Sequence, residues 1–354
     1  MAAHAPIRML IVGTGGMARA HAQAYAEMEG VELVAGVDVN PARVAEFNAE
    51  YGIEHGFASV EEALVWGGFD AASNVTPDAI HHRTTMPLLA AGKHVLCEKP
   101  LAANHADAAE MAAAAQAAGV VNMVNLTYRN VPALNKAAEL VGAGAIGEPR
   151  HFEASYLQSW LTQPKWGHWD KESQWLWRLS TEHGSMGVLG DVGVHILDFA
   201  THIAGSDAVD VSCRLRTFDK AEGGKIGEYT LDANDSCVMH MGLKNGAVGV
   251  IHASRFASGH INDLRLQLFG TKGGLDVRFE GETSVLKASL GDDMLDGRWV
   301  DVPTADVATN YQRFVNAIQS GTLAGPDFAR GADLQKVLDL AVESDAARAA
   351  ILAI

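Results

Sequence analysis

The stretch Met9-Leu10-Ile11-Val12-Gly13-Thr14-Gly15-Gly16-Met17-Ala18 (MLIVGTGGMA) decides the fold of this chain. A short apolar run, typical of a buried strand, ends in a cluster of glycines, and a helical stretch follows at once. In this G-x-G-x-x-A spacing, Gly13 permits a tight turn and Gly15 lets the backbone approach a pyrophosphate, while Ala18 lets the helix lie close to the sheet. The pattern predicts a strand, turn and helix that bind a dinucleotide.

The cofactor prediction assigns the whole loop to phosphate binding: Gly13, Thr14, Gly15, Gly16, Met17 and Ala18. Asp38 ends the second expected strand about 20 residues further on, where a carboxylate can accept both ribose hydroxyls of an adenosine. This carboxylate would repel a 2'-phosphate and so favours NAD, although Arg43 in the next helix could soften the repulsion and keeps NADP possible. The alternative is a glycine turn in an α/β fold that binds no nucleotide.

The alternation of elements predicts the architecture. From Ile7 to about Asn125 apolar runs alternate with helical stretches, which indicates a doubly wound parallel sheet covered on both faces. From His151 onward longer alternating segments separated by turn signals predict a large, mostly antiparallel sheet, followed by helices over about 310–320 and 329–349. We therefore expect an α/β domain over residues 1–127 and an α+β domain over 128–354.

Composition limits the classes of function. The chain has 354 residues, 48% of them hydrophobic and 20% charged, which is enough for a sizeable core and suits two domains. A net charge of -16 argues against nucleic acid as a partner. Three cysteines without a CxxC spacing argue against a disulfide framework and suit the cytoplasm. No apolar run reaches the roughly 18 residues that a membrane span needs, so we expect no membrane partner.

Two further segments contain candidate catalytic residues. Glu98-Lys99-Pro100 stands at the carboxyl end of an expected parallel strand, the edge where such sheets bind ligands, and Lys99 could relay a proton there. A solvated lysine paired with Glu98 is the alternative. In LGDVGVHILD, Asp191 and His195 share one face if the segment is helical, so that one face offers an acid and a base. The structural alternatives are that Asp191 caps a helix, that His195 is a hydrogen-bonded core histidine, and that Asp198 pairs with an unseen cation. Asp191 and His195 could also bind a metal, but the chain lacks the usual metal-binding motifs, so we expect no metal.

Five motifs together, VGTGGMA, NVTPDAIHH, AGKHVLCEKPL, GDVGVHILD and GTKGGL, resemble the Gfo/Idh/MocA oxidoreductases, the glucose–fructose oxidoreductase and inositol dehydrogenase family. The resemblance spans nearly the whole chain. It implies an N-terminal Rossmann domain, an α+β domain whose open sheet faces a partner subunit, and a homodimer or homotetramer. It also implies oxidation or reduction of sugars and cyclic polyols with NAD or NADP.

The resemblance further implies roles for individual residues. Lys99 matches the lysine that helps to position nicotinamide and substrate, and Asp191 and His195 match the D-x-G-x-H pair whose histidine is the catalytic acid/base. The residues implied to lie beside the cofactor are Asn74, Thr76, Pro77, His81 and Glu98. Tyr128 and Arg129 match a Y-R pair that follows the next strand.

The substrate prediction rests on a segment that holds five of the seven tryptophans, namely Trp160, Trp166, Trp169, Trp175 and Trp177. Tryptophan rings can stack on a sugar, and Gln158, His168 and Arg178 could bond its hydroxyls. Packing of a long loop or a subunit interface is the alternative. The residues assigned to a monosaccharide, anhydrosugar or inositol-like polyol are Tyr128, Arg129, Gln158, Trp160, Trp177, Arg178, Asp191 and His195.

Two other classes of protein use the same fold. One comprises cofactor-binding regulators without turnover, and the other comprises NAD-assisted glycosidases. The joint presence of Lys99, Asp191 and His195 favours a dehydrogenase over a regulator.

Overall fold

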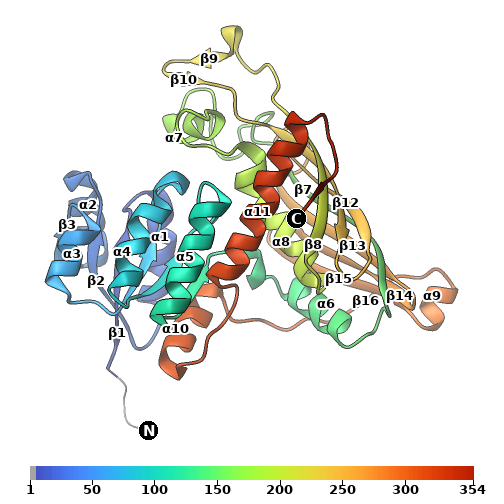
Figure 1. The fold of residues 1–354 in the computed structure, drawn as a ribbon, viewed down its shortest axis with the longest axis horizontal. Helices are drawn as coiled ribbons and strands as arrows, with labels where there is room; N and C mark the ends of the chain where they lie inside the picture. Colours follow the sequence, from blue (N-terminus) through green and yellow to red (C-terminus); the bar gives the residue numbers. More distant parts are fainter. Residues whose placement is uncertain (1–4) are drawn as a thin grey trace. The chain divides into compact units, whose positions relative to one another are not determined.

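The computed structural model describes residues 5–354, which form two compact units (Figure 1). The first unit contains the chain up to Leu126 together with Ala308–Gln335, and the second contains Thr127–Val307 together with Lys336–Ile354. The chain passes from the first unit to the second between Leu126 and Thr127, one residue before the boundary expected from the sequence, and the return of Ala308–Gln335 to the first unit has no counterpart in the expected division.

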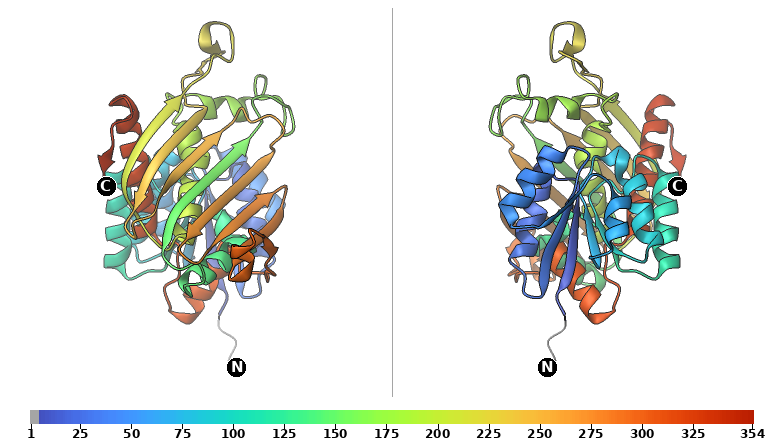
Figure 2. Two further views of the ribbon diagram at one scale, coloured as in Figure 1. Left: turned by 90° about the vertical axis from the view of Figure 1, so that its right-hand side faces the viewer. Right: turned by 90° about the vertical axis from the view of Figure 1, so that its left-hand side faces the viewer.

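The first unit is built on a six-stranded parallel sheet with the order β3-β2-β1-β4-β5-β6, the order of a dinucleotide-binding sheet. Its strands are β1 (Ile7–Val12), β2 (Val31–Val37), β3 (His55–Phe57), β4 (Ala71–Asn74), β5 (His94–Cys97) and β6 (Asn122–Val124). Its helices are α1 (Gly16–Ala26), α2 (Pro41–Tyr51), α3 (Val60–Trp66), η1 (Asp78–Ile80), α4 (His81–Ala90), α5 (His105–Ala118) and α10 (Asn310–Ser320). Figure 2, right, shows these helices on both sides of the sheet.

Local sequence explains where several of these helices begin. Asn40 caps α2 by accepting the amides of Ala42 and Arg43, with Pro41 in the first turn. Thr309 and Gln312 form a capping box at the start of α10. Apolar side chains of α10 then pack into the core of the first unit, and this explains why a segment so late in the sequence belongs to it.

The second unit is built on a nine-stranded sheet with the order β16-β15-β14-β13-β7-β12-β11-β8-β17. All its neighbours are antiparallel except β7 and β12, so the predicted large, mostly antiparallel sheet is confirmed. Its strands are β7 (Pro149–Gln158), β8 (Ala208–Arg216), β11 (Ser236–Leu243), β12 (Val248–Ser254), β13 (Asn262–Gly270), β14 (Gly273–Glu280), β15 (Thr283–Leu290), β16 (Val300–Asp301) and β17 (Leu352–Ala353). Figure 2, left, shows one face of this sheet largely uncovered by the helices that the structure describes.

Short helices pack on the other face or lie beside the sheet. The helices of this unit are η2 (Thr127–Asn130), α6 (Pro132–Gly142), α7 (Ser173–Leu176), η3 (Trp177–Leu179), a π-helical turn η4 (Leu189–Gly193), α8 (Val194–Ile203), η5 (Glu222–Gly224) and α9 (Asp292–Leu295). The strands β9 (Lys225–Ile226) and β10 (Tyr229–Thr230) form a separate two-stranded sheet. Helix α11 (Phe328–Ala346) runs from the first unit into the second.

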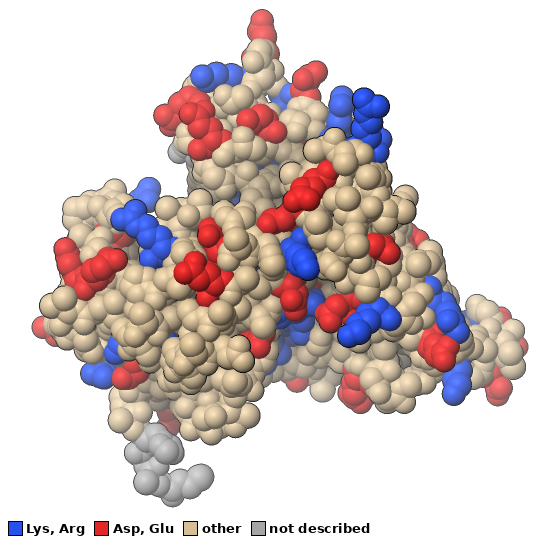
Figure 3. All heavy atoms as spheres, viewed as in Figure 1, with Lys and Arg blue, Asp and Glu red and all other residues tan. Residues whose placement is uncertain are grey.

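Charged side chains are dispersed on the face of the molecule drawn in Figure 3, where Lys and Arg alternate with Asp and Glu. Within residues 5–354, no helix is both long enough and apolar enough to cross a bilayer.

Candidate active site

The glycine loop between β1 and α1 has the shape that a dinucleotide needs. Gly13 adopts a left-handed φ of 87°, and a Cβ there would stand 2.8 Å from the carbonyl oxygen of Val75. At Gly15 and Gly16, by contrast, an added Cβ would meet no described atom within 4 Å, so open space lies beside the start of α1. Ala18 is fully buried, as expected for a helix that lies close to its sheet. These features fit a pyrophosphate at the helix N-terminus.

Asp38, directly after β2, is held as a hydrogen-bond acceptor. Its Oδ2 accepts from the amide and hydroxyl of Thr14 at 3.0 and 3.2 Å, and its Oδ1 accepts from the amide of Asn40 at 2.9 Å. A carboxylate offers about four lone-pair positions, so acceptor capacity remains for ribose hydroxyls. Asp38, which would bind the adenosine ribose, is thereby hydrogen-bonded to Thr14 in the glycine loop.

The loop after β4 is organised by Asn74. Its Oδ1 accepts from the amide and hydroxyl of Thr76 at 3.2 and 2.8 Å, and its Nδ2 donates to the hydroxyl of Thr85 at 2.8 Å. His81 bridges this loop to the segment after β5, because its two ring nitrogens lie 2.7 Å from the carbonyl oxygen of Thr76 and 2.9 Å from that of Pro100. Two motifs that are far apart in the sequence are therefore joined by one ring.

His81 bonds carbonyl oxygens through both ring nitrogens. A carbonyl oxygen only accepts hydrogen bonds, so both bonds form together only when both ring nitrogens carry hydrogen, that is, in the imidazolium form. Burial opposes the charge, but Cys97, Asp78 and the Pro100 carbonyl outweigh it and raise the pKa of His81 to about 10. His81 is therefore a buried cation that holds Thr76 and Pro100.

Glu98 follows β5, and its carboxylate is engaged on both oxygens. His21 Nε2 lies 2.8 Å from Oε1, Asn125 Nδ2 donates to the same oxygen at 2.6 Å, and the amide of Lys99 donates to Oε2 at 3.1 Å. Burial opposes ionisation, but His21, the charge of Lys99 and the hydrogen bond from Asn125 together lower the pKa of Glu98 to about 2. Because an ionised carboxylate only accepts, Nε2 of His21 must be the protonated nitrogen of that contact.

Glu98 therefore fixes the backbone from which the Lys99 side chain projects. The sequence alone did not single out His21 or Asn125. The signal for His21 was its place on the helix that the glycine loop opens, on the same face as the buried Ala18.

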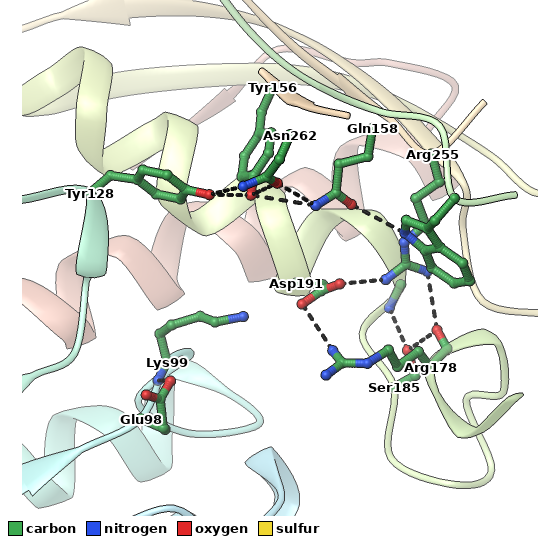
Figure 4. A network of polar contacts seen from close by, with 12 residues as sticks. Glu98, Lys99, Tyr128, Tyr156, Gln158, Arg178, Ser185, Asp191, Arg255 and Asn262 are labelled. Carbon is green, nitrogen blue, oxygen red and sulfur yellow. Dashed lines mark hydrogen bonds and ion pairs between the residues drawn. The ribbon is translucent and has the colours of Figure 1, made fainter. Parts of the chain in front are cut away.

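In the second unit four polar side chains form one network, drawn in Figure 4. Asn262 Oδ1 accepts from the Tyr156 hydroxyl at 2.6 Å and from Gln158 Nε2 at 2.9 Å, while its Nδ2 donates to the Tyr128 hydroxyl at 2.8 Å. The two tyrosine hydroxyls lie 2.5 Å apart. Since Tyr156 donates its single hydrogen to Asn262, the hydrogen between the hydroxyls comes from Tyr128. One lone pair of the Tyr128 oxygen is then left to accept a further hydrogen bond.

His195 lies in α8 beside this network and is 6% exposed. Its ring centroid is 4.9 Å from that of Tyr128 in an edge-to-face arrangement. Burial raises the pKa of both Tyr128 and Tyr156, so these hydroxyls stay neutral near pH 7 and act as hydrogen-bond groups.

Asp191 lies in the π-helical turn that precedes α8. Its Oδ1 accepts from Arg178 Nη1 at 3.3 Å and its Oδ2 from Arg255 Nη2 at 3.0 Å, as Figure 4 shows. Two guanidinium groups therefore orient a single carboxylate. Arg255 could not be selected from the sequence, because a lone arginine at the end of a strand is usually solvated.

Arg129 makes a bidentate ion pair with Asp198 at 2.6 and 2.7 Å. Both side chains are largely buried, with 12% and 4% exposed. Arg129 is therefore a cation that pairs with Asp198. This ion pair links η2, which carries Tyr128, to α8, which carries His195.

The tryptophan-rich segment forms a small apolar cluster of its own. Trp160, which is 5% exposed, packs there with Leu179, and its indole nitrogen donates to Gln158 Oε1 at 3.2 Å. The other members of the cluster are Leu161, Trp166, Trp169, Trp175, Leu176, Ala221, Ile226, Tyr229, Leu231 and Phe256. Trp177 is outside this cluster, and the guanidinium carbon of Arg178 lies 4.8 Å from the Trp177 ring centroid and 5.9 Å from that of Trp175.

The parallel sheet with its glycine loop and acidic strand end is typical of an NAD-binding domain. Residues 7–126 match the oxidoreductase family with an NAD-binding Rossmann fold, and residues 134–276 match the Gfo/Idh/MocA C-terminal domain. The chain belongs to the Gfo/Idh/MocA oxidoreductases, and both the expected family and the expected NAD-binding fold are confirmed.

Several named proteins are similar over most of their length. Levoglucosan dehydrogenase of Pseudarthrobacter phenanthrenivorans is 26% identical, with 95% of each chain covered. Myo-inositol 2-dehydrogenase of Thermotoga maritima is 27% identical, with 79% of this chain and 78% of the relative covered. Among solved structures, levoglucosan dehydrogenase in complex with NADH and levoglucosan superposes with a TM-score of 0.87 at 25% identity, with 99% of each chain covered.

Proposed function

We propose that this protein transfers a hydride between NAD and a secondary alcohol or carbonyl of a sugar, anhydrosugar or cyclic polyol, with His195 as the acid/base. NADP is the less favoured cofactor because Asp38 would repel its 2'-phosphate. The observation that carries the proposal is the second unit's arrangement of His195 beside a chain of hydroxyl and amide groups, with the bound carboxylate of Asp191 in the preceding turn. The named relatives, which include levoglucosan and inositol dehydrogenases, support the substrate class.

The roles of the residues follow from their chemistry. NAD supplies the hydride acceptor when it is bound. His195 takes the hydroxyl proton as the C–H bond breaks, because imidazole is the side chain suited to proton transfer near neutral pH. Lys99 donates a hydrogen bond to the same oxygen and stabilises the charge that develops there. In the reductive direction His195 returns the proton.

The remaining predicted substrate residues offer complementary hydrogen-bond groups. The Tyr128 oxygen accepts a hydroxyl hydrogen of the sugar, and the guanidinium of Arg178 donates to a hydroxyl oxygen. Trp177, which is packed against Arg178 rather than inside the apolar cluster, offers an aromatic surface to the sugar ring. Gln158 and Trp160 support the substrate-binding groups indirectly, because Gln158 donates a hydrogen bond to Asn262 and Trp160 donates one to Gln158.

A spectrophotometric assay tests the proposal. The protein is incubated with NAD or NADP and a panel of sugars, anhydrosugars, inositols and glycosides, while reduced cofactor is followed by absorbance. We expect reduction of NAD with at least one sugar or polyol. Cleavage of a glycoside without net reduced cofactor would indicate a glycosidase, and cofactor binding without any turnover would indicate a regulator.

Single substitutions test the assigned roles. We expect His195→Ala and Lys99→Met each to depress kcat by roughly 100-fold or more, because each removes a group that acts on the reacting oxygen. Binding of NAD, measured by calorimetry, should survive in His195→Ala. Wild-type turnover in both variants would refute the roles.

We infer further that the protein forms a homodimer or homotetramer through the uncovered face of the nine-stranded sheet. Val238 and Val248 are 46% and 57% exposed on β11 and β12. Their pairing partners His252 and Gly242 put both valines on the same face.

A cytoplasmic location agrees with the three free cysteines, Cys97, Cys213 and Cys237.

A further inference from the structure

Arg255 is a fully buried arginine at the edge of the site in the second unit. Its side chain has 0% exposure, and it is the largest side chain buried to this degree among residues 5–354. Burial lowers the pKa of its guanidinium, and Asp191 opposes that effect. A charge in such a place is costly unless it is paired, and an apolar side chain of similar size would fill the space without that cost. The groups that the Arg255 guanidinium contacts should therefore explain why an arginine is present at this position.

The guanidinium contacts two elements and an aromatic ring. Nη2 donates to Asp191 Oδ2 at 3.0 Å in the π-helical turn, and Nη1 donates to the Arg178 carbonyl oxygen at 3.1 Å in η3. Its carbon lies 5.0 Å from the ring centroid of Trp160, close enough for a cation–π contact. One side chain thereby joins the carboxylate, the backbone of the second arginine and the aromatic cluster.

Arg255 is itself fixed from behind. It follows β12 directly, and its amide donates to the Asp235 carbonyl oxygen at 3.0 Å. The Asp235 side chain forms a fully buried ion pair with Lys220 at 2.5 Å and accepts from the Phe218 amide. The charged groups that act on the guanidinium include Asp191, Arg178 and Asp235.

Arg255 is the closer and the more buried of the two arginines at Asp191. Of the two arginines, Arg178 lies farther from Asp191, with Nη1 3.3 Å from Oδ1, and the Arg178 side chain is 28% exposed. A partly solvated arginine fixes a carboxylate less well than a buried one, because its side chain keeps rotamer freedom and its charge is screened. Of these two arginines, Arg255 therefore constrains the Asp191 carboxylate more strongly.

We propose that Arg255 is a positioning residue of this active site, which acts through Asp191 by holding its carboxylate oriented toward the substrate. The inference rests on the proposed dehydrogenase function. Arg255 also contacts Trp160 and the Arg178 backbone, so that it holds Asp191 and Arg178 at a constant distance from the aromatic cluster.

A double-mutant cycle on kcat/KM tests the inference. The four proteins are the wild type, Arg255→Met, Asp191→Asn and the double variant, each assayed with the sugar or polyol identified above. We expect Arg255→Met to lower kcat/KM by about 10- to 100-fold in the wild type, the usual cost of one charge-assisted hydrogen bond. In the Asp191→Asn background the same substitution should change kcat/KM by less than about threefold, because the group through which it acts is absent.

Two further variants serve as controls. Arg298→Met removes an arginine that is 61% exposed and pairs with Asp293 and Asp296, and it should leave kcat/KM unchanged. Arg255→Lys keeps the charge but offers one nitrogen instead of a fork, so its kcat/KM should fall between those of the wild type and Arg255→Met. If Arg255→Met does not fold, as judged by circular dichroism, the cycle is run with Arg255→Lys.

The outcomes separate the inference from the proposed function. Losses that multiply in the double variant, or wild-type kcat/KM in both Arg255 variants, overturn the positioning role while the dehydrogenase function stands. A wild type without turnover on any sugar or polyol removes the function and the inference together.

Discussion

The two carbonyl oxygens bonded to His81 determine its charge, and the charge has a consequence for stability. A histidine in an unfolded chain has a pKa near 6.5, whereas the pKa of His81 in the folded chain is raised to about 10. The folded state therefore binds this proton more tightly. The stability that His81 contributes is fully present below pH about 6.5 and is lost as the pH rises toward 10.

We expect His81→Gln to flatten the decline of the melting temperature between pH 6.5 and 10, because glutamine has no proton to lose there. Thermal unfolding followed by circular dichroism measures this. His82→Gln is the matched control, since the neighbouring ring is partly exposed and bonds the exposed Glu110. Equal pH slopes for the wild type and His81→Gln would show that His81 is not the cation inferred from its two carbonyl partners.

Some residues of the site could be predicted from the sequence because their signals are local. The glycine loop, Asp38, Lys99, Asp191 and His195 stand in short motifs whose spacing reflects the chemistry. Arg255 and His21 could not be predicted in this way. Their burial depends on partners that are far away in the sequence, such as Asp191 for Arg255 and Glu98 for His21.

At the scale of elements, the tryptophan-rich segment divides into rings that pack in the apolar cluster and Trp177, which lies outside the cluster. Trp175 packs in the apolar cluster, with its ring centroid 5.8 Å from that of Trp160, whereas Trp177 lies outside the cluster. The sequence alone left sugar stacking and loop packing open because both use the same residue type. The structure describes packing for most of these rings and leaves Trp177 as the candidate for stacking.

The pair Trp175→Ala and Trp177→Ala tests this division. We expect Trp175→Ala to lower the free energy of unfolding by about 2–3 kcal/mol, because it leaves a cavity in a cluster that is itself partly exposed. Trp177→Ala should change that free energy by less than about 1 kcal/mol and raise KM for the sugar. Urea unfolding and steady-state kinetics give the two readings, and the reverse pattern would assign stacking to Trp175.

Elements differed in how far their patterns predicted them. The helix expected over 310–320 is observed at Asn310–Ser320, and that expected over 329–349 corresponds to Phe328–Ala346. The π-helical turn at Leu189–Gly193 was not predicted, since its wider hydrogen-bond spacing has no sequence signature of its own. Asp191 lies inside this turn, so the helix that carries the D-x-G-x-H motif is irregular at the acid and regular at His195.

At the scale of the whole molecule, the division into an α/β and an α+β unit could be predicted because strand–helix alternation stops once along the chain. The return of Ala308–Gln335 to the first unit could not, because helical periodicity specifies an apolar face but not the core that buries it. Phe314 and Val315 of α10 supply that face and are buried in the core of the first unit.

The uncovered sheet face leads to the last prediction. Val238 and Val248 lie on a face that the described helices leave largely open, and a charge placed there in a subunit interface would be desolvated at high cost. We expect the wild type to have the mass of a dimer or tetramer by light scattering, and Val238→Glu and Val248→Glu to shift it toward the monomer. Val65→Glu is the control, because Val65 on α3 is 90% exposed and belongs to the first unit rather than to this sheet. A monomeric wild type, or an unchanged mass in both sheet variants, would show that this face is not the subunit interface.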